Sequence, residues 1–205
     1  MLPSDKSLAA FYNLDSPVSA NFVLRCTGEY FDSKGSSRGI SNAIDRKHLV
    51  HLRSQAGAVV TGGTTARIEG YLPSSKFKTY VFSRSERLAG LSVLAFEGRQ
   101  ELLGIFELLC QENERVLVEV GPVLLNEFLL TGVIDTLFCT VVHFSDSCIC
   151  LAETIGSLEN TISIVESVLA LPRGASVTSF QLEDTVLARF DCGEPYRRRR
   201  TGEIA

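Results

Sequence analysis

The stretch Ser37–Tyr71 decides the fold class, and it reads SRGISNAIDRKHLVHLRSQAGAVVTGGTTARIEGY. Asn42 belongs to the residue types that cap helix N-termini, and Leu49 and Leu52 follow it on one face at helical spacing. Ala58–Thr61 is a short apolar run, which is typical of a buried strand. A helix followed directly by a buried strand is the repeating unit of a sheet covered by crossover helices. The stretch therefore predicts an α/β fold.

The same alternation continues on both sides of this stretch. Apolar periodicity predicts strands at Asn21–Cys26, Tyr80–Phe82, Ser92–Phe96, Arg115–Glu119 and Asp135–Val142, and helices at Gln100–Gln111 and from Pro122 onward. Beyond Ser145 no helical period is evident, and apolar runs separated by turns predict antiparallel hairpins at Ile162–Leu171, Val177–Leu182 and Val186–Phe190. We therefore expect a single domain over residues 1–195, with a mixed, mostly parallel central sheet flanked by helices and C-terminal antiparallel strands.

The composition is that of a globular protein that folds around one core. Of the 205 residues, 45% are hydrophobic and 21% are charged, which argues against a disordered or fibrous chain. The formal net charge is −4 although Arg197–Arg200 contributes four positive charges, so the rest of the chain repels nucleic acid. We expect residues 196–205 to form a disordered basic tail, and we expect no nucleic-acid partner.

Membranes and metals are not expected as partners. No apolar run approaches the roughly 18 residues that a membrane span needs, so we expect a cytoplasmic location. The cysteines form no C-x-x-C pair, none has a histidine at zinc-finger spacing, and His48, His51 and His143 are scattered. We therefore expect no metal site, and buried thiols at Cys26, Cys110, Cys139, Cys148, Cys150 and Cys192.

A glycine-rich loop at Thr61–Thr65, with the sequence TGGTT, follows a predicted strand directly. Ligands in open α/β sheets bind beyond the carboxyl ends of strands, so this loop lies where a ligand is expected. Glycines let backbone N–H groups approach a diphosphate, and threonine hydroxyls can donate hydrogen bonds to it. The alternative is a tight turn without a ligand, because the run is no G-x-G-x-x-G motif.

Two further strand-end loops have the same potential. Ser83–Ser85 offers an arginine fork between hydroxyls, which suits a phosphate monoester, although an exposed polar turn explains it equally well. Glu119–Pro122 places a carboxylate at the end of a buried strand, which is costly unless the group has a partner or a role. The helix that follows offers its free N–H groups to a phosphate.

Several strings together resemble a known family, the pyrimidine reductase domain of bacterial riboflavin biosynthesis, which has a dihydrofolate reductase-like fold. Ser37–Tyr71 is similar to the family's order of a serine-glycine loop, D-R, L-R, V-G-x-G-T and R-x-E-G-Y. The strings SANFVLRCTGEY, VFSRSERL, RVLVEVGPVLLNEFLLTGVIDTL and LEDTVLARF also occur in the family's order. The resemblance therefore extends over nearly the whole chain.

The resemblance implies an NADPH-dependent reductase that converts the ribosyl group of 5-amino-6-(5-phosphoribosylamino)uracil to ribityl by hydride transfer. It implies that Glu69 and Glu119 are catalytic, with Glu69 handling the proton that the departing ring oxygen needs. The residues that would bind NADPH are Gly39, Gly62, Gly63, Thr64, Thr65, Ser83, Arg84, Gly121, Pro122, Val123 and Leu124. Those that would bind the substrate are Thr27, Ser37, Arg53, Glu119 and Lys76, the last at a position where the family usually has arginine.

The resemblance also implies a partner subunit. Members of the family generally form homodimers through the sheet region. The apolar run Ile162–Leu171 would suit such an interface. We therefore expect a homodimer that acts on a small molecule, either a phosphoribosylamino-pyrimidine or a similar compound such as a pterin.

Two positions depart from the family's pattern. The hydroxyl of Thr27 stands where the family has the carboxylate of S-L-D-G. Val120 replaces the first glycine of E-G-G-P, a pair joined by a cis bond in the dihydrofolate reductase fold, and a β-branched residue adds strain to such a bond. We therefore expect a different local backbone at Val120. An alternative is a non-catalytic or substrate-shifted homologue that keeps the fold as a dimeric NADPH-binding module.

Overall fold

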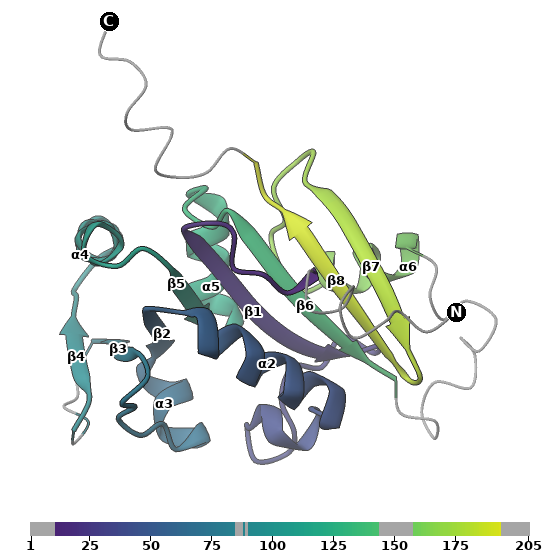
Figure 1. Ribbon diagram of the computed structural model, residues 1–205, viewed down its shortest axis with the longest axis horizontal. Helices are drawn as coiled ribbons and strands as arrows, with labels where there is room; N and C mark the ends of the chain where they lie inside the picture. The colour runs from purple at the N-terminus through teal and green to yellow at the C-terminus, as the bar shows by residue number, and fades with distance from the viewer. Residues whose placement is uncertain (1–10, 85–87, 89, 144–157, 194–205) are drawn as a thin grey trace, which may run out of the picture.

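The computed structural model describes residues 11–84, 88, 90–143 and 158–193, which form an eight-stranded sheet with helices on both faces (Figure 1). The strands are β1 (Val18–Arg25), β2 (Ala58–Gly62), β3 (Lys78–Ser83), β4 (Ser92–Ala95), β5 (Val116–Glu119), β6 (Thr136–Val142), β7 (Ser176–Leu182) and β8 (Thr185–Asp191). The helices are the 3-10 helix η1 (Ser37–Gly39) and the α-helices α2 (Ala43–Gln55), α3 (Gly63–Glu69), α4 (Arg99–Glu112), α5 (Pro122–Leu130) and α6 (Leu158–Glu166). The predicted basic tail, Ser85, Cys148 and Cys150 lie outside the described residues.

The strand order of the sheet is β4-β3-β2-β5-β1-β6-β8-β7. Every neighbouring pair from β4 to β6 is parallel, whereas β8 runs antiparallel to both β6 and β7. This arrangement confirms the predicted mixed sheet that ends in antiparallel strands. The carboxyl ends of β2, β3 and β5 meet at one edge, because these strands are parallel and adjacent.

Helix α2 covers one face of the sheet. Its N-terminus is capped as the sequence predicts, because Asn42 Oδ1 accepts a hydrogen bond from the Asp45 amide at 3.0 Å. Leu52 is fully buried, and it packs against Val59 of β2 and Leu117 of β5 in a small core cluster. This packing holds the side chains of α2 over the middle strands.

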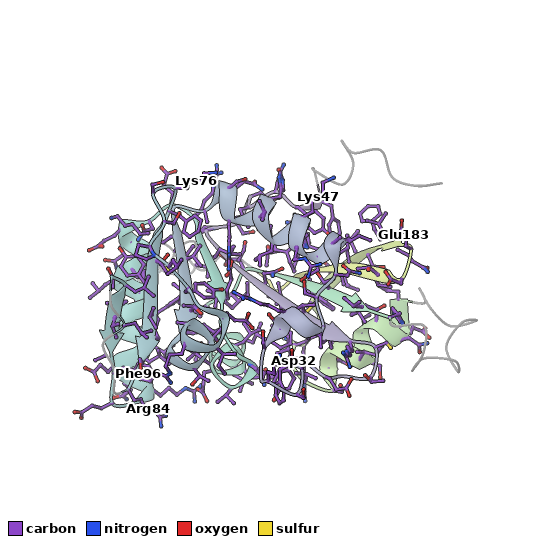
Figure 2. All side chains as sticks on the ribbon, turned by 90° about the horizontal axis from the view of Figure 1, so that it is seen from below. Asp32, Lys47, Lys76, Arg84, Phe96 and Glu183 are labelled. Atoms are coloured by element: carbon purple, nitrogen blue, oxygen red, sulfur yellow. The ribbon has the colours of Figure 1, made fainter. Side chains whose placement is uncertain are left out.

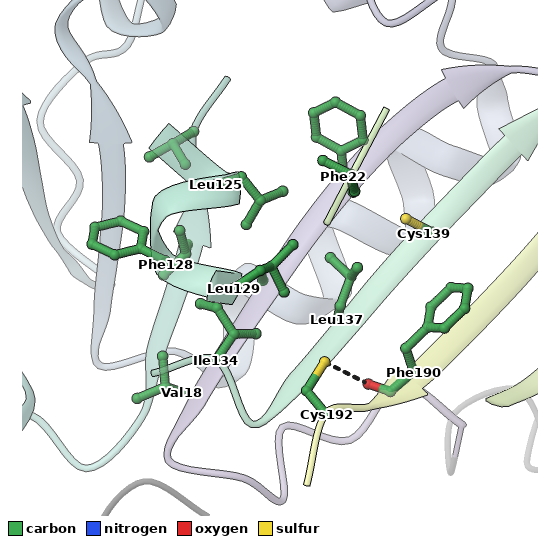
Figure 3. Packing of buried hydrophobic residues seen from close by; sticks show 14 of the residues in the cluster. Val18, Phe22, Leu125, Phe128, Leu129, Ile134, Leu137, Cys139, Phe190 and Cys192 are labelled. Carbon is green, nitrogen blue, oxygen red and sulfur yellow. Dashed lines mark hydrogen bonds between the residues drawn. The ribbon is translucent and has the colours of Figure 1, made fainter. Parts of the chain in front are cut away.

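Helices α4, α5 and α6 cover the opposite face, where the larger core cluster lies. Leu125 and Leu129 of α5 point toward β1 and β6, as Figure 3 shows. Phe106 of α4 and Phe128 of α5 stack with their ring centroids 4.5 Å apart. Pro122 is the first residue of α5, where its missing N–H costs no hydrogen bond. Packing of α5 in the core therefore holds its first residue, Pro122, close to Glu119 at the end of β5.

The predicted strand over Ile162–Leu171 is wrong, because Leu158–Glu166 is helix α6. Val165 of α6 and Leu169, just beyond its end, are both buried. The many β-branched residues of this segment favoured the strand in the sequence. Both side chains belong to the core of their own subunit, so they offer no free apolar surface for the homodimer interface predicted here.

The glycine-rich loop also contains a helix that the sequence reading missed. Helix α3 begins at Gly63 and ends before Gly70, whose φ of 64° is left-handed and favours glycine. Thr64 and Thr65 therefore lie in the first turn of a helix instead of in an open loop. No helix in the described segments is both long enough and apolar enough to cross a bilayer.

Three of the predicted thiols are confirmed. Cys110, Cys139 and Cys192 are buried free cysteines, and the Cys192 thiol donates to the Phe190 carbonyl at 3.6 Å (Figure 3). Burial raises the pKa of the Cys192 thiol to about 12, so it is unreactive. The expectation is wrong at Cys26, which is disulfide-bonded.

Candidate active site

A cleft of about 1280 Å³ lies between α2, α3 and α5, beyond the carboxyl ends of β2, β3 and β5. Its volume exceeds the roughly 300–1,000 Å³ of a pocket for one drug-sized ligand. The cleft therefore has room for a dinucleotide together with a second small molecule. It occupies the edge of an open α/β sheet at which ligands bind.

The three strand-end loops singled out in the sequence meet at this cleft. Thr65, Arg84 and Gly121 all line it, although they follow three different strands. A Cβ atom built on Gly62 would lie 3.9 Å from Thr65 Oγ1, and one built on Gly121 would lie 3.8 Å from the same atom. The Thr65 hydroxyl therefore stands between the loop after β2 and the loop after β5.

Gly63 lets the loops after β2 and β3 approach each other. A Cβ atom at Gly63 would lie 2.7 Å from Ser83 Oγ, which is closer than side chains tolerate. Ser83 is buried at the end of β3, and the exposed Arg84 follows it with its guanidinium 5.9 Å from the Phe96 ring centroid. Figure 2 shows Arg84 and Phe96 side by side at one edge of the molecule. This corner of the cleft combines an aromatic ring, a cation and a hydroxyl.

Arg53, Tyr71 and Glu119 form a hydrogen-bonded triad on the α2 side of the cleft. Arg53 Nε donates to Glu119 Oε1 at 2.8 Å, and its Nη2 donates to the Tyr71 hydroxyl at 2.8 Å. The Tyr71 hydroxyl in turn donates to Glu119 Oε2, which also accepts from Arg53 Nη2. Glu119 is thus buried with a cation and a hydroxyl as partners, which offsets the cost of burying its charge.

The electrostatics of the triad fix its protonation. Burial opposes the charged form of Arg53, but the hydrogen bonds and the charge of Glu119 outweigh it and raise the arginine pKa. Burial and the Glu119 charge raise the pKa of Tyr71 well above its ordinary value. Arg53 therefore stays cationic and Tyr71 stays neutral at any physiological pH.

Glu69 holds the loop that contains η1. Its Oε1 accepts from the Ser37 amide at 2.6 Å, and both of its carboxylate oxygens accept from the Ser36 hydroxyl, at 3.1 and 3.2 Å. Arg38 Nε lies 3.4 Å from Oε2, and Arg38 also donates to the Glu69 carbonyl. Glu69, to which the family resemblance gives the role of handling a proton, therefore has its carboxylate bonded to Ser36, Ser37 and Arg38.

Three residues of the predicted site do not line the cleft. Thr27 is exposed and donates to Glu29, so it lies away from the other substrate residues. Gly39 allows close packing, because a Cβ atom there would overlap the Asp32 carboxyl group. Lys76 precedes β3 whereas Arg84 follows it, and Figure 2 shows them at opposite sides of the molecule. The remaining predicted site residues all line the cleft.

The backbone at Val120 follows the expectation from its sequence. All peptide bonds of the described residues are trans, so Val120 and Gly121 lack the cis bond of the glycine pair. Val120 is buried and lines the cleft beside Glu119. A side chain thus occupies a position where the family pattern has none.

Several polar residues of the cleft wall have no role in the sequence analysis, among them Asn21, Asp45 and Tyr71. Asp45 and Tyr71 belong to the D-R and E-G-Y strings, but no spacing in the sequence assigned either a role. Asn21 interrupts an apolar strand, which is the signal that singles it out. His48, one turn beyond Asp45, packs against Tyr12 and Phe138 instead of binding a metal, and burial lowers its pKa to about 2.

No protein-family model matches the sequence, and no curated protein matches it either. Solved structures do match. A pyrimidine reductase-like protein from Corynebacterium diphtheriae is 15% identical with a TM-score of 0.63, over 88% of this chain and 93% of that chain. The riboflavin biosynthesis reductase of Saccharomyces cerevisiae is 12% identical with a TM-score of 0.57, over 88% of this chain and 91% of that chain.

A third similar structure is dihydrofolate reductase from Enterococcus faecalis complexed with NADP(H). It is 14% identical with a TM-score of 0.56, over 86% of this chain and 96% of that chain. The three TM-scores show that the chain has the dihydrofolate reductase-like fold that the sequence predicts. At identities this low the likeness shows the fold alone. Two of these three structures are named as reductases, and the third is named as pyrimidine reductase-like.

Proposed function

We propose that this protein is an NADPH-dependent reductase that converts the ribosyl group of 5-amino-6-(5-phosphoribosylamino)uracil, or of a similar ribosylated heterocycle, to ribityl. The observation that carries the proposal is the meeting of the loops after β2, β3 and β5 at one cleft. A cleft of about 1280 Å³ accommodates both reactants at once, as a direct hydride transfer requires. The reductase names of the structural neighbours support the same reaction class.

The residues on the α3 and α5 side of the cleft fit NADPH. Gly62 and Gly121 leave the backbone uncovered where a diphosphate would approach, Gly63 lets the loop after β3 come close, and Thr64 and Thr65 offer hydroxyl donors. Pro122, Val123 and Leu124 would contact the cofactor at the start of α5. NADPH supplies the hydride when bound, and the protein's part is to orient it against the substrate.

Ser83 and Arg84 would recognise the phosphate on the adenosine ribose of NADPH. Arg84 is exposed beside Phe96, and both residues line the cleft. Its guanidinium has no acidic partner among the described residues. An arginine fork binds a phosphate with charge-assisted hydrogen bonds, which NADH does not offer at this position. Arg84 therefore gives the site its preference for NADPH.

The substrate would lie on the α2 side, against Ser37, Arg53 and Glu119. Glu119 acts here together with Arg53 and Tyr71, so the triad presents a fixed hydrogen-bonding surface. The predicted substrate contacts of Thr27 and Lys76 and the predicted NADPH contact of Gly39 stay predictions. None of the three residues lines the cleft of this structure.

Titration of the purified protein with NADPH, followed by cofactor fluorescence, tests the proposal. We expect saturable binding and then oxidation of NADPH when 5-amino-6-(5-phosphoribosylamino)uracil is added. Absence of binding at about millimolar NADPH, which corresponds to roughly −4 kcal/mol, would refute the cofactor assignment.

A second candidate is a cofactor-binding homologue without this activity. The observation that favours it is the absence of a carboxylate at Thr27, which is exposed and bonded to Glu29. Binding of NADPH without oxidation in the presence of the pyrimidine would support this candidate over the reductase.

We also propose a homodimer in the cytoplasm. Val165 and Leu169 do not contribute to its interface, because both are buried in the core. Gel filtration with light scattering should give twice the mass of the 205-residue chain. A clean monomer peak would exclude the dimer.

A further inference from the structure

Asp45 is a buried carboxyl group in the wall of the cleft. It lies in the first turn of α2, lines the cleft, and exposes only 3% of its surface. Ser41 Oγ donates to Asp45 Oδ2 at 2.7 Å, which fixes the orientation of the carboxyl group. The other oxygen, Oδ1, is buried without a hydrogen-bond partner. A buried polar atom left in this state is costly, so it points to a ligand that completes it.

The other carboxyl groups of the cleft wall differ from Asp45. Glu119 is bound by Arg53, Glu69 lies 3.4 Å from Arg38 Nε, and Glu127 lies 2.9 Å from Arg99 Nε. Each of these three groups therefore has an arginine partner. Asp45 has no such ion pair among the described residues, since neighbouring Arg46 donates to the Ser41 carbonyl at 3.3 Å.

The surroundings of Asp45 favour its protonated form. Burial raises the pKa of Asp45 and outweighs the hydroxyls of Ser41 and Thr140, which lower it. The Thr140 hydroxyl faces the group from β6 but is not within hydrogen-bond geometry. The titratable and charged groups that interact with Asp45 are Arg46 on α2, Glu119 on β5, Cys139 on β6 and Tyr12 before β1.

Asn21 provides a second unsatisfied oxygen on the same side of the cleft. It is buried in β1, it lines the cleft, and its Oδ1 has no hydrogen-bond partner. Its neighbours Ala20 and Phe22 belong to the core on the opposite face, so alternation turns Asn21 toward α2. The Asn21 oxygen suits a hydrogen-bond donor of a polar ligand, such as an amino group on a heterocycle, whereas a protonated Asp45 suits an acceptor oxygen of the same ligand.

We propose that Asp45 donates the proton in the reduction, in the role that the sequence assigned to Glu69. This inference rests on the proposed function. NADPH gives a hydride to the ribosyl carbon that bears the nitrogen, and the bond from that carbon to the ring oxygen breaks. The ring oxygen takes the electron pair of the broken bond and a proton from Asp45 and becomes a hydroxyl. Asp45 is left as a carboxylate, NADPH leaves as NADP⁺, and solvent returns the proton to Asp45.

The test compares the wild type with Asp45→Asn and Glu69→Gln, which remove one carboxyl group each at nearly constant shape. Oxidation of NADPH is followed with 5-amino-6-(5-phosphoribosylamino)uracil across pH of about 5 to 9. Asp45→Asn is expected to lower kcat by roughly 100-fold or more. The wild type should lose kcat as the pH rises and Asp45 ionises, and Glu69→Gln should keep that alkaline limb while Asp45→Asn lacks it.

Two readouts separate this role from a structural one. Asp45→Asn should bind NADPH as the wild type does and melt at an equal or higher temperature, because the substitution removes an unpaired buried acid. Infrared difference spectra of the two proteins without ligands should show a protonated carboxyl band that disappears as the pH rises. This band reports on Asp45 without any need for activity.

The outcomes are distinguishable. Wild-type turnover with an Asp45→Asn variant that keeps its kcat and its alkaline limb would overturn the role of Asp45. The same holds if the infrared band is missing at about pH 5, because the group would then be ionised throughout the working range. A wild type that binds NADPH but never oxidises it with this pyrimidine would overturn the proposed function instead.

Discussion

Two tyrosine hydroxyls near the α2 side of the sheet should respond oppositely to removal. The Tyr71 hydroxyl bonds to Arg53 and Glu119, whereas the Tyr12 hydroxyl is buried without a hydrogen-bond partner. Hydrogen bonds to charged groups contribute about 1.5–3 kcal/mol each. Tyr71→Phe removes two such hydrogen bonds but leaves the Arg53–Glu119 pair in place, and Arg53 is partly exposed. We therefore expect the stability to fall by about the contribution of one hydrogen bond, not of two. That loss is about 1.5–3 kcal/mol of unfolding free energy.

Tyr12→Phe removes a buried hydroxyl that lacks a partner, so we expect no loss or a gain of up to about 1 kcal/mol. Denaturant titrations of both variants and the wild type measure these differences. For a chain of this size, about 1 kcal/mol shifts the melting temperature by roughly 2–4 °C, so Tyr71→Phe should melt roughly 3–12 °C lower. Equal effects of the two substitutions, or an unchanged Tyr71→Phe, would refute the triad as a stabilising unit.

Three further predictions concern the cleft. Arg84→Ala should weaken NADPH binding by about 10-fold or more and leave NADH binding unchanged, and equal effects in titrations with both cofactors would remove Arg84 from the site. Gly63→Ala should destabilise the fold by about 1–3 kcal/mol, because the added methyl group would meet Ser83 Oγ. Gly104→Ala, in the exposed part of α4, should stabilise it by about 0.5–1 kcal/mol. Thermal melts that rank the two variants otherwise would contradict the close packing at Gly63. The folded-state pKa of Asp45 is raised, so wild-type stability is full below the unfolded pKa and falls as pH rises through the folded one. Asp45→Asn should therefore gain on the wild type as the pH rises above the unfolded pKa of about 3.9, by about 1.4 kcal/mol per unit by which the folded pKa is raised, and a constant difference in unfolding free energy would exclude the shift.

The order of strands and helices could be predicted where the sequence carries local signals. Asn42 marks the start of α2, Pro122 marks the start of α5, and apolar runs mark the buried strands. Strand β1 and helix α6 show the limits. β1 begins at Val18, before the predicted Asn21, because pairing with β5 and β6 sets its length. The β-branched residues of α6 mimic a strand, and only packing on the sheet decides for a helix.

The site could be predicted as far as the parallel sheet determines it. Loops after adjacent parallel strands must lie at one edge, so the meeting of Thr65, Arg84 and Gly121 follows from strand order. The partners of individual side chains do not follow in this way. Arg53 and Glu119 lie 66 positions apart, and their pairing depends on how α2 rests on the sheet. For the same reason the family resemblance indicated Glu69 and gave Asp45 no role, since the burial of each group is a tertiary property.

The central claim is that one cleft binds NADPH along the loops after β2, β3 and β5. A crystal structure of the protein with NADPH measures this directly. We expect the diphosphate at Thr65 and Gly121, the ribose phosphate at Arg84, and the nicotinamide facing the side of the cleft that carries Asp45 and Glu119. A cofactor bound at any other surface, or crystals that remain free of it at saturating NADPH, would contradict the account.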